Sequence, residues 1–450
     1  MRMGTKAAAW AVALSLGPLA GSCEKSDSDT NTPENVSATV SPTISTVVQV
    51  SWTTESESTG YVEYGPTEAL GQRTPLEAAA STEHSVALLG LKAGTPYFYR
   101  VVIWDGDEAA ASSIQTVETG FLPTVLPSLT LQGGGHEEYT LVPLLGTTTA
   151  ATIIDGDGDI VWYHIEDRDL DVYRVRLAND GESILYNAGS VSGDPADNSE
   201  LVRVPLDGSP PSSIPLSLLA HDFVELPDGT MTAIVVEYRD VNGVQVRGDR
   251  LVEVAPDGTQ TQVWSAWDCF DPALHPVAEM AHGWTFANAL DYDPTGDVYY
   301  LGMRNFSSIT RINRQTGACE WVLGQTASTL TFAPGTLPFL HQHQFQMLEN
   351  GHLLVFDNEG SPGNISRVVE YQLDLVAGTA TQVWDYTSDP TVYTFVLGEP
   401  TRMAGGDTFV NWSAAGQLER VGADGTSKWK LNSGAGYAFG FNTLETSLYP

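Results

Sequence analysis

The stretch QTGACEWVLG, residues Gln315–Gly324, combines a turn containing glycine with an apolar strand that carries a tryptophan. Four further stretches show the same order of turn, strand and tryptophan: DGDGDIVWYH (155–164), DGTQTQVWSAW (257–267), AGTATQVWDY (377–386) and DGTSKWKLN (424–432). A unit that recurs along a chain indicates a repeat architecture rather than a set of unrelated strands. We therefore expect this part of the chain to consist of copies of one β-unit.

The spacing of the tryptophans gives the number of units. Successive intervals are 102, 57, 63 and 45 residues by subtraction, counted along Trp162, Trp264, Trp321, Trp384 and Trp429. The first interval is about twice the others, so a unit without tryptophan is expected inside it. The segment ELVRVPLDGSPPSSIPLS (200–217) has the required strand, Asp-Gly turn and second strand. Six units of about four strands predict a six-bladed β-propeller over residues 129–450, with the final TLETSLYP closing the ring.

Residues 36–122 show a different pattern, in which short stretches of alternating polar and apolar residues are separated by turns. Strands are expected at VVQVSW, GYVEYG, HSVALLGL and TPYFYRVVIW, a set suited to one β-sandwich and to an all-β fold class for the whole chain. The segment LKAGTPYFYRV (Leu91–Val101) resembles the fibronectin type III signature, and Trp52 stands where that family has a buried tryptophan. The resemblance implies a fibronectin-like spacer, followed by the linker FLPTVLPSL.

The first residues are expected to direct export. Arg2 and Lys6 precede a short apolar run and small residues, as in a signal peptide over residues 1–22. The segment LAGSC resembles a bacterial lipobox, so Cys23 is the expected site of lipid attachment, and the polar residues 23–35 fit a flexible tether. The protein is therefore expected in the bacterial cell envelope, on the periplasmic or surface side, held at the membrane through this anchor alone.

Charge and cysteine content set further limits. The formal net charge of −35 and a pI near 4.3 would repel nucleic-acid phosphates, so nucleic acid is excluded as a partner. Apart from Cys23, the chain has two cysteines, Cys269 and Cys319. In an oxidising compartment these two could form a disulfide, and two buried free thiols are equally compatible with the sequence.

Polar and aromatic residues occur at corresponding positions, just before or within the expected inner strands of successive repeats. They are His221 in HDFVELPDG, Phe286 and Asn288 in WTFANALDYDP, and His343 in QHQFQMLENGH. The inner strands of a propeller line one central channel, so these side chains are expected to meet at one mouth of it. The strand that follows ends with Arg304 and Asn305 in the second of these repeats, and with Asp357 and Asn358 in the third.

The motifs HDFVELPDG, LGMRN, ITRINRQTGACEWVLG and QHQFQMLENGHLLVFDN resemble, in order and spacing, those of the bacterial arylsulfate sulfotransferases. The resemblance covers the whole expected propeller. It implies transfer of a sulfuryl group from a phenolic sulfate donor to a phenolic acceptor, without any cofactor. It also implies that His343 is the nucleophile and that His221 and Arg304 hold the sulfuryl group. No phosphate-cradling Gly-rich loop occurs in the sequence, which agrees with a reaction that uses no nucleotide.

The residue types suit this chemistry. A neutral imidazole can attack sulfur and form a sulfohistidine, from which an acceptor phenol then takes the group. Guanidinium and imidazole N–H donors can hold the sulfuryl oxygens while charge develops on them. His343, Arg304 and His221 provide these groups.

One position departs from the family pattern. The family carries a histidine two residues before the asparagine of the second motif, and here that residue is Phe286. His282, four residues earlier, is an alternative source of the missing imidazole, although nothing in the spacing predicts it. We expect Phe286 and Asn288 to contact substrate, with the phenylalanine stacking on an aromatic ring, unless Phe286 marks a propeller that no longer catalyses the reaction. Two hypotheses therefore stand: a sulfotransferase that works through His343, and a non-catalytic surface propeller that binds a ligand or a protein at the same mouth.

Three other patterns are assigned no function. His341 and His352 are expected to be structural, and a metal site from His341 and His343 lacks a third ligand at suitable spacing, so no metal is expected. DGDGD (Asp155–Asp159) resembles half of a calcium loop without its closing acidic ligand, which favours a blade turn. RGD (Arg247–Asp249) is interpreted as a chance occurrence in a loop.

Overall fold

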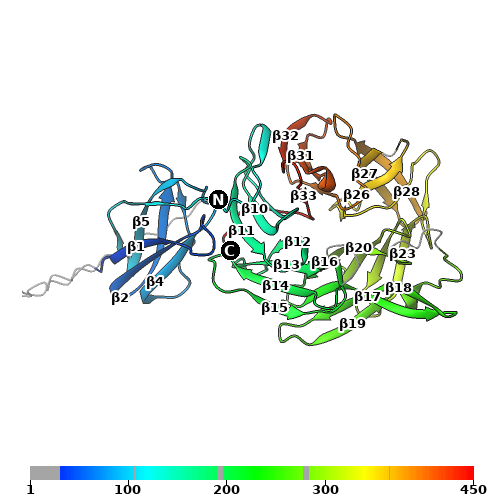
Figure 1. Cartoon of the computed structure of the whole chain (residues 1–450), viewed down its shortest axis with the longest axis horizontal. Helices are drawn as coiled ribbons and strands as arrows, with labels where there is room; N and C mark the ends of the chain where they lie inside the picture. The colour runs from blue at the N-terminus through cyan, green and yellow to red at the C-terminus, as the bar shows by residue number, and fades with distance from the viewer. Residues whose placement is uncertain (1–30, 106–107, 190–195, 277–282, 364) are drawn as a thin grey trace, which may run out of the picture.

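The computed structural model describes residues 31–450 except 106–107, 190–195, 277–282 and 364. These residues form a curled sheet at one end of the long axis of the molecule and a ring of six sheets at the other (Figure 1). The predicted fold class, all-β with a six-bladed propeller, is confirmed. Cys23, the expected signal peptide and His282 lie outside the described residues. Within the described part of the chain, no helix is long and apolar enough to cross a membrane.

The N-terminal unit is a seven-stranded sheet that curls into a roughly sandwich-like shape. Its strands are β1 (Glu34–Val40), β2 (Val48–Gly65), β3 (Gln72–Arg73), β4 (Ser81–Leu88), β5 (Pro96–Asp105), β6 (Glu108–Ala111) and β7 (Gln115–Glu118). The first half of β2 pairs with β1 and β4, and its second half pairs with β3 and β5, so one long strand serves both layers. Trp52 is buried between them and stacks on His84. The likeness to fibronectin type III stays a prediction.

Each blade of the propeller is an antiparallel sheet whose main strands follow one another along the chain. The first strands of most neighbouring blades contact each other, which places them around the channel. The first three blades contain β9 (Tyr139–Leu145), β10 (Thr149–Ile154) and β11 (Ile160–Glu166); β12 (Asp171–Leu177), β13 (Ser183–Gly189), β14 (Glu200–Pro205) and β15 (Ser212–Pro215); and β16 (Leu219–Glu225), β17 (Met231–Val241), β18 (Val244–Val254) and β19 (Gln260–Ser265), followed by the short helix α1 (Ala266–Cys269).

The other three blades complete the ring. They contain β20 (Ala287–Asp293), β21 (Val298–Met303), β22 (Ser308–Asn313) and β23 (Cys319–Gly324); β25 (Phe345–Met347), β26 (Leu353–Ser361), β27 (Ile365–Asp374) and β28 (Thr379–Tyr386), with β24 (Thr331–Phe332) at the edge; and β29 (Glu399–Arg402), β30 (Thr408–Asn411), β31 (Gln417–Val421) and β32 (Ser427–Asn432), with the 3-10 turn η1 (Ser413–Ala415).

The ring closes from both of its ends. Strand β8 (Thr130–Gly133) pairs with β32 at the outer edge of the sixth blade. Strands β33 (Ala438–Phe439) and β34 (Thr443–Glu445) pair with β9 of the first blade, as predicted for the last segment. Both pairings cover sheet edges that would otherwise be exposed.

The tryptophan repeat corresponds to the outermost main strand of each blade. The five residues lie in β11, β19, β23, β28 and β32, and the second blade, which ends with β15, is the unit without tryptophan. Two of the indoles bridge to the next blade: Trp162 Nε1 donates to the Leu206 carbonyl, and Trp429 Nε1 donates to the Gly156 carbonyl, each at 3.0 Å. These two tryptophans therefore connect neighbouring blades.

The two units share a buried surface. Tyr449, next to the C-terminus, accepts the Leu89 N–H at 2.9 Å and lies 3.2 Å from the Tyr64 hydroxyl. Lys92 inserts its ammonium among the carboxylates of the DGDGD turn, 2.7 Å from Asp157 and 2.8 Å from Asp159. This turn connects β10 to β11 and receives a lysine from the N-terminal unit.

Cys269 and Cys319 form a disulfide, with their Cα atoms 6.3 Å apart. Cys269 ends α1 after the third blade, and Cys319 begins β23 of the fourth blade. The bridge therefore connects the outer edges of two neighbouring blades, next to the segment that leads to β20.

Candidate active site

Four of the predicted site residues come together in the structure. His221 lies near the start of β16, Phe286 immediately precedes β20, and His343 lies two residues before β25. The ring centroids of His221 and Phe286 are 4.9 Å apart, and Arg304 Cζ, just after β21, lies 5.9 Å from the Phe286 centroid. The three rings are buried. Side chains from three successive blades thus meet where their inner strands begin.

His343 is held in one tautomer by its neighbours. Its Nδ1 lies 2.9 Å from Oδ1 of Asn358. The Asn358 amide nitrogen donates to the carbonyls of Thr394 and Leu397, at 2.8 and 3.0 Å, which fixes the amide with its oxygen toward the imidazole. Because that oxygen can only accept, Nδ1 must carry the proton. The lone pair then lies on Nε2, as a nucleophile requires.

The surroundings also keep His343 neutral. Burial lowers the pKa of His343 well below its usual value, and the nearby Arg304 and His221 lower it further. The hydrogen bond to Asn358 acts in the opposite direction but does not outweigh burial. The side chain is therefore a neutral imidazole at neutral pH.

Arg304 is anchored on one side. Its backbone N–H donates to the Phe286 carbonyl at 2.9 Å, its Nη1 donates to Asn305 at 3.1 Å, and its Nη2 lies 3.9 Å from Glu359. Glu359 is in turn bound by His341 Nδ1 at 2.6 Å, so His341 supports the carboxylate behind the arginine. A guanidinium has five N–H donors, and the contacts with described residues leave several of them for an anionic group.

Two further residues at the mouth were not singled out as site residues from the sequence. The Tyr173 ring, in β12, lies 5.2 Å from the His221 ring, and Arg247 Cζ, in β18, lies 5.1 Å from the Phe286 centroid. Arg247 belongs to the RGD segment, which the sequence assigned to a loop. That assignment was wrong, because the segment lies within β18 and pairs with β17. The next residue, Arg250, also pairs with β19.

Asn288 is fully buried in β20, and its amide nitrogen donates to the Gln342 carbonyl at 2.9 Å. Gln342 directly precedes His343, and its own amide nitrogen donates to the Ser308 carbonyl at 2.9 Å. Asn288 therefore fixes the backbone that carries the histidine. Contact between Asn288 and a substrate stays a prediction.

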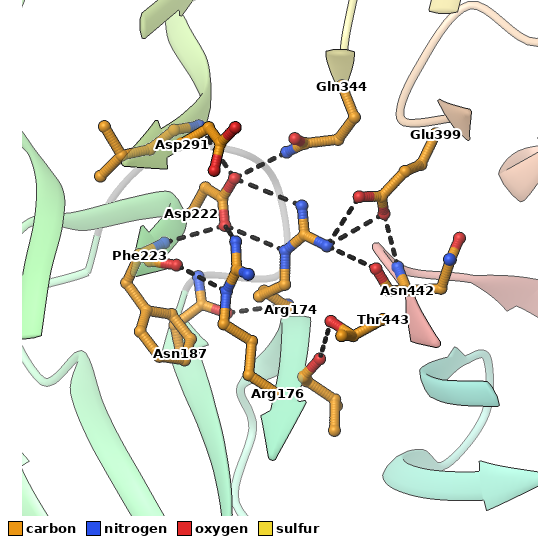
Figure 2. A network of polar contacts seen from close by, with 12 residues as sticks. Arg174, Arg176, Asn187, Asp222, Phe223, Asp291, Gln344, Glu399, Asn442 and Thr443 are labelled. Carbon is orange, nitrogen blue, oxygen red and sulfur yellow. Dashed lines mark hydrogen bonds and ion pairs between the residues drawn. The ribbon is translucent and has the colours of Figure 1, made fainter. Parts of the chain in front are cut away.

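A buried network of charged and polar groups lies beside these residues along the inner strands (Figure 2). Arg174 of β12 donates from Nε to Asp222 of β16 at 3.0 Å. Its Nη1 donates to both carboxylate oxygens of Glu399 in β29, at 2.9 and 3.0 Å, and to the Asn442 carbonyl at 2.7 Å. One arginine thus joins the second, third and sixth blades to the segment between β33 and β34 in the first blade.

The remaining two blades are joined through Asp222. Its Oδ2 accepts the Leu290 N–H of β20 at 2.9 Å and the Gln344 amide nitrogen at 2.7 Å. Asp222 follows His221 in the chain, and Gln344 follows His343. The Asp222–Gln344 bond therefore fixes the two histidine-bearing strands relative to each other.

Charge pairing favours the ionised form of Asp222 despite its burial. Burial opposes ionisation of Asp222, yet Arg174 and Arg176 hold the pKa of this carboxyl below its usual value. Burial raises the pKa of Glu399, with Arg174 acting against it. The sequence did not reveal Arg174 or Glu399, because each lies in a blade without a motif. The only available signal was the polar residue directly after each histidine.

The last histidine of the QHQFQMLENGH motif, His352, is bound elsewhere, since its Nδ1 lies 2.6 Å from Glu370. In the ranges that the structure describes, no group of three or more His, Cys, Asp or Glu side chains is arranged to hold a metal ion.

Comparison with known proteins addresses the family. The model of the arylsulfotransferase (ASST) family matches residues 137–434, about two thirds of the chain. No curated protein sequence gives a significant match. Similar solved structures include a protein of unknown function from Bacteroides caccae, with 15% identity over 67% of this chain and 97% of that one and a TM-score of 0.45. Another is a catalytically inactive virginiamycin B lyase from Staphylococcus aureus with quinupristin, with 11% identity over 68% and 99% and a TM-score of 0.39.

These structural similarities are too low to carry any statement about activity. The family match is different in kind, because it spans all six blades and includes His221, Phe286, Arg304 and His343. The chain belongs to the arylsulfotransferase family.

Proposed function

We propose that the propeller transfers a sulfuryl group from an aryl sulfate to a phenolic acceptor through a sulfohistidine on His343. The observation that carries the proposal is the state of this imidazole: buried, neutral, and with its Nδ1 proton directed to Asn358. A histidine in that state has its Nε2 lone pair available for attack on sulfur.

The neighbouring cation fits the charge that the reaction must handle. A sulfuryl group carries anionic oxygens, and hydrogen bonds from a fixed guanidinium to such oxygens are among the stronger ones in proteins. Arg304 has donors left after its contacts with Asn305 and Glu359. We assign Arg304 and His221 to the sulfuryl oxygens, where they would stabilise the transition state without reorganisation.

The alternative is a surface propeller that binds an aromatic ligand or a protein at this mouth and catalyses nothing. One observation favours it: Phe286 places a hydrocarbon ring among the polar side chains of the site. The sulfotransferase hypothesis and an aromatic-ligand propeller both predict that an aryl sulfate binds. They differ in whether a covalent intermediate forms on His343.

The experiment is to incubate the purified protein with 4-nitrophenyl sulfate, with and without a phenolic acceptor, and to map the modified peptide by mass spectrometry. We expect one sulfuryl group on His343 when no acceptor is present, and loss of this label with release of sulfated acceptor when one is added. His343→Ala should abolish both signals, whereas the matched control His352→Ala should leave them unchanged. Binding without any label, under every donor tried, would decide for the non-catalytic propeller.

A further inference from the structure

The loop between β28 and β29, residues 387–398, carries two exposed aromatic side chains. Tyr393 is 44% and Phe395 is 57% exposed, whereas Thr394 between them is buried. The loop leads into β29, the first strand of its blade, so it lies at the mouth where His343 precedes β25. Rings exposed at this place offer apolar surface to another ring that enters the mouth.

The backbone of this loop supports the nucleophile. The Thr394 and Leu397 carbonyls accept the Asn358 amide nitrogen at 2.8 and 3.0 Å. The oxygen of the same amide lies 2.9 Å from Nδ1 of His343. Ser366 fixes the loop further, since its hydroxyl accepts the Thr394 N–H at 2.9 Å. The position of the loop relative to His343 is therefore set by hydrogen bonds.

One residue of the loop has a strained backbone. The φ of Leu397 is 56°, in the left-handed region that bulky side chains rarely adopt. Such strain persists where surrounding contacts over-determine the conformation, and it concentrates at functional sites. Leu397 is buried, its carbonyl is bound by Asn358, and the next carbonyl, that of Gly398, accepts the Gln344 N–H at 3.2 Å. The path of the loop past the site is thus a built feature of the fold.

A carboxylate connects Tyr393 to the arginine of the site. The Tyr393 hydroxyl donates to Oε1 of Glu359 at 3.3 Å, and the same oxygen lies 3.9 Å from Nη2 of Arg304. His341 Nδ1 lies 2.6 Å from the other oxygen of Glu359. Asn358 and Glu359 are consecutive residues, so the loop contacts the supports of both the nucleophile and the arginine. Tyr393 and its neighbours therefore form the edge of the site beside these two groups.

The geometry of the reaction decides what reaches this edge. Nε2 of His343 forms the N–S bond, the S–O bond to the donor aryl group breaks, and its electron pair leaves on the aryl oxygen, which takes a proton from water. The acceptor oxygen then forms a new S–O bond and loses its proton to water, and the S–N electron pair returns to Nε2. Both oxygens lie opposite Nε2 in an in-line displacement, so the two aryl groups use one place in turn. Because His343 is buried, that place extends toward the exposed rim.

Resting on the function proposed above, we propose that Tyr393 and Phe395 are specificity-determining residues whose rings bind the aryl group of the donor and, after it has left, that of the acceptor. Aromatic rings that meet offset or edge to face attract each other beyond the gain from burying apolar surface. A larger ring makes more of this contact. The site therefore selects a two-ring acceptor over phenol, and an aryl acceptor over water.

The test uses the full chain, 4-nitrophenyl sulfate as donor, and phenol or 2-naphthol as acceptor. We expect the wild type to have the higher kcat/KM for 2-naphthol, and Phe395→Ala to lower that value about 10-fold and the value for phenol by less. Tyr393→Ala should act in the same way, whereas Tyr393→Phe keeps the ring and should stay close to the wild type. The matched control Phe121→Ala removes a phenylalanine that is 81% exposed in the linker between the two units, and should change neither value.

A reaction without an aryl acceptor separates ring binding from a structural effect. When no phenol is present, water removes the sulfuryl group from His343, and the label should disappear at the same rate in the wild type and in Phe395→Ala. An equal fall in rate with water and with 2-naphthol would mean that the substitution disturbs His343 itself, and the proposal would be wrong. Unchanged kcat/KM for both phenols in Phe395→Ala and Tyr393→Ala would also overturn it.

The aryl site and the function on which it rests can fail separately. If no donor labels His343 in the wild type, the proposed function is wrong, and calorimetric titration with 4-nitrophenyl sulfate then tests the aryl site. Weaker binding to Phe395→Ala than to the wild type supports the role of the rings, and equal affinity overturns it.

Discussion

Arg174 and Arg304 lie in the same propeller, the first in the inner strand β12 of the second blade and the second just after β21 of the fourth blade, and their pairing differs. Arg174 has Asp222, Glu399 and the Asn442 carbonyl as acceptors within 3.0 Å of its nitrogen atoms. Among the described residues, Arg304 has the Asn305 side chain at 3.1 Å and a carboxylate, that of Glu359, at 3.9 Å. The hydrogen-bond donors of Arg174 are occupied by acceptors within the protein. Contacts with described residues leave several donors of Arg304 for a ligand.

The difference shows how a propeller can assemble a site from distant segments. The Arg174 network joins all six blades and fixes the strands of His221 and His343 through the Asp222–Gln344 bond. With the strands fixed in this way, Arg304 does not need a strong internal partner to stay in position. Changes in the first region should therefore affect stability, and changes in the second should affect catalysis alone.

The largest expected effect is on stability. Arg174→Met leaves Asp222 and Glu399 buried without their cation, and breaking a buried ion pair in this way costs about 3–5 kcal/mol. We expect the free energy of unfolding, from denaturant titration followed by tryptophan fluorescence, to fall by that amount. The matched control is Arg203→Met, which removes a partly exposed arginine paired with Asp180 and Glu225 and should cost no more than about 1 kcal/mol. Equal losses in the two variants would contradict the special position of Arg174.

The second effect is on turnover. Arg304→Met removes the guanidinium assigned to the sulfuryl oxygens, and loss of one preorganised donor to a developing charge costs about 10²–10³-fold in rate. We expect that drop in kcat/KM for 4-nitrophenyl sulfate with an unchanged free energy of unfolding. Arg311→Met, in the same blade but paired with Glu320 in the outer strands, should change neither quantity. If Arg304→Met lowered the free energy of unfolding as much as Arg174→Met does, the separation of stability and catalysis between the two regions would be wrong.

The fold and the mouth residues were accessible from sequence for physical reasons. Each blade repeats one pattern, so Trp162 and its counterparts count the blades, and inner strands converge, so His221 and His343 were expected together. The contacts of Asp249 and the Arg174 network were not accessible in this way. Asp249 acts on Thr285 and Ala287 through contacts between strands that are far apart in the chain. Such pairings follow from the register of strands in three dimensions, which a period in the sequence does not encode.

The RGD segment shows why a local pattern misled. Charged residues flanking a glycine are typical of an exposed turn, and nothing in those three letters indicates burial. In the structure the charges are accommodated because Asp249 receives a hydroxyl and an N–H, and because Arg247 lies over an aromatic ring. The hydroxyl, the N–H and the ring belong to Thr285, Ala287 and Phe286, at the start of β20.

The smallest expected effect is a shift in pH dependence, and it connects Arg304 to His343. Only the neutral imidazole has a lone pair for sulfur, so kcat/KM for the donor falls when His343 becomes protonated. Burial, with Arg304 and His221 nearby, holds the pKa of His343 well below its usual value of about 6.5. The rate should therefore stay constant as pH falls through 6.5 and decline only at a more acidic pH. Arg304→Met removes one positive charge and should move that decline toward 6.5, whereas Arg311→Met should leave it in place. A wild-type decline centred near 6.5 would mean that His343 titrates as an exposed histidine does, and the buried, neutral nucleophile would have to be abandoned.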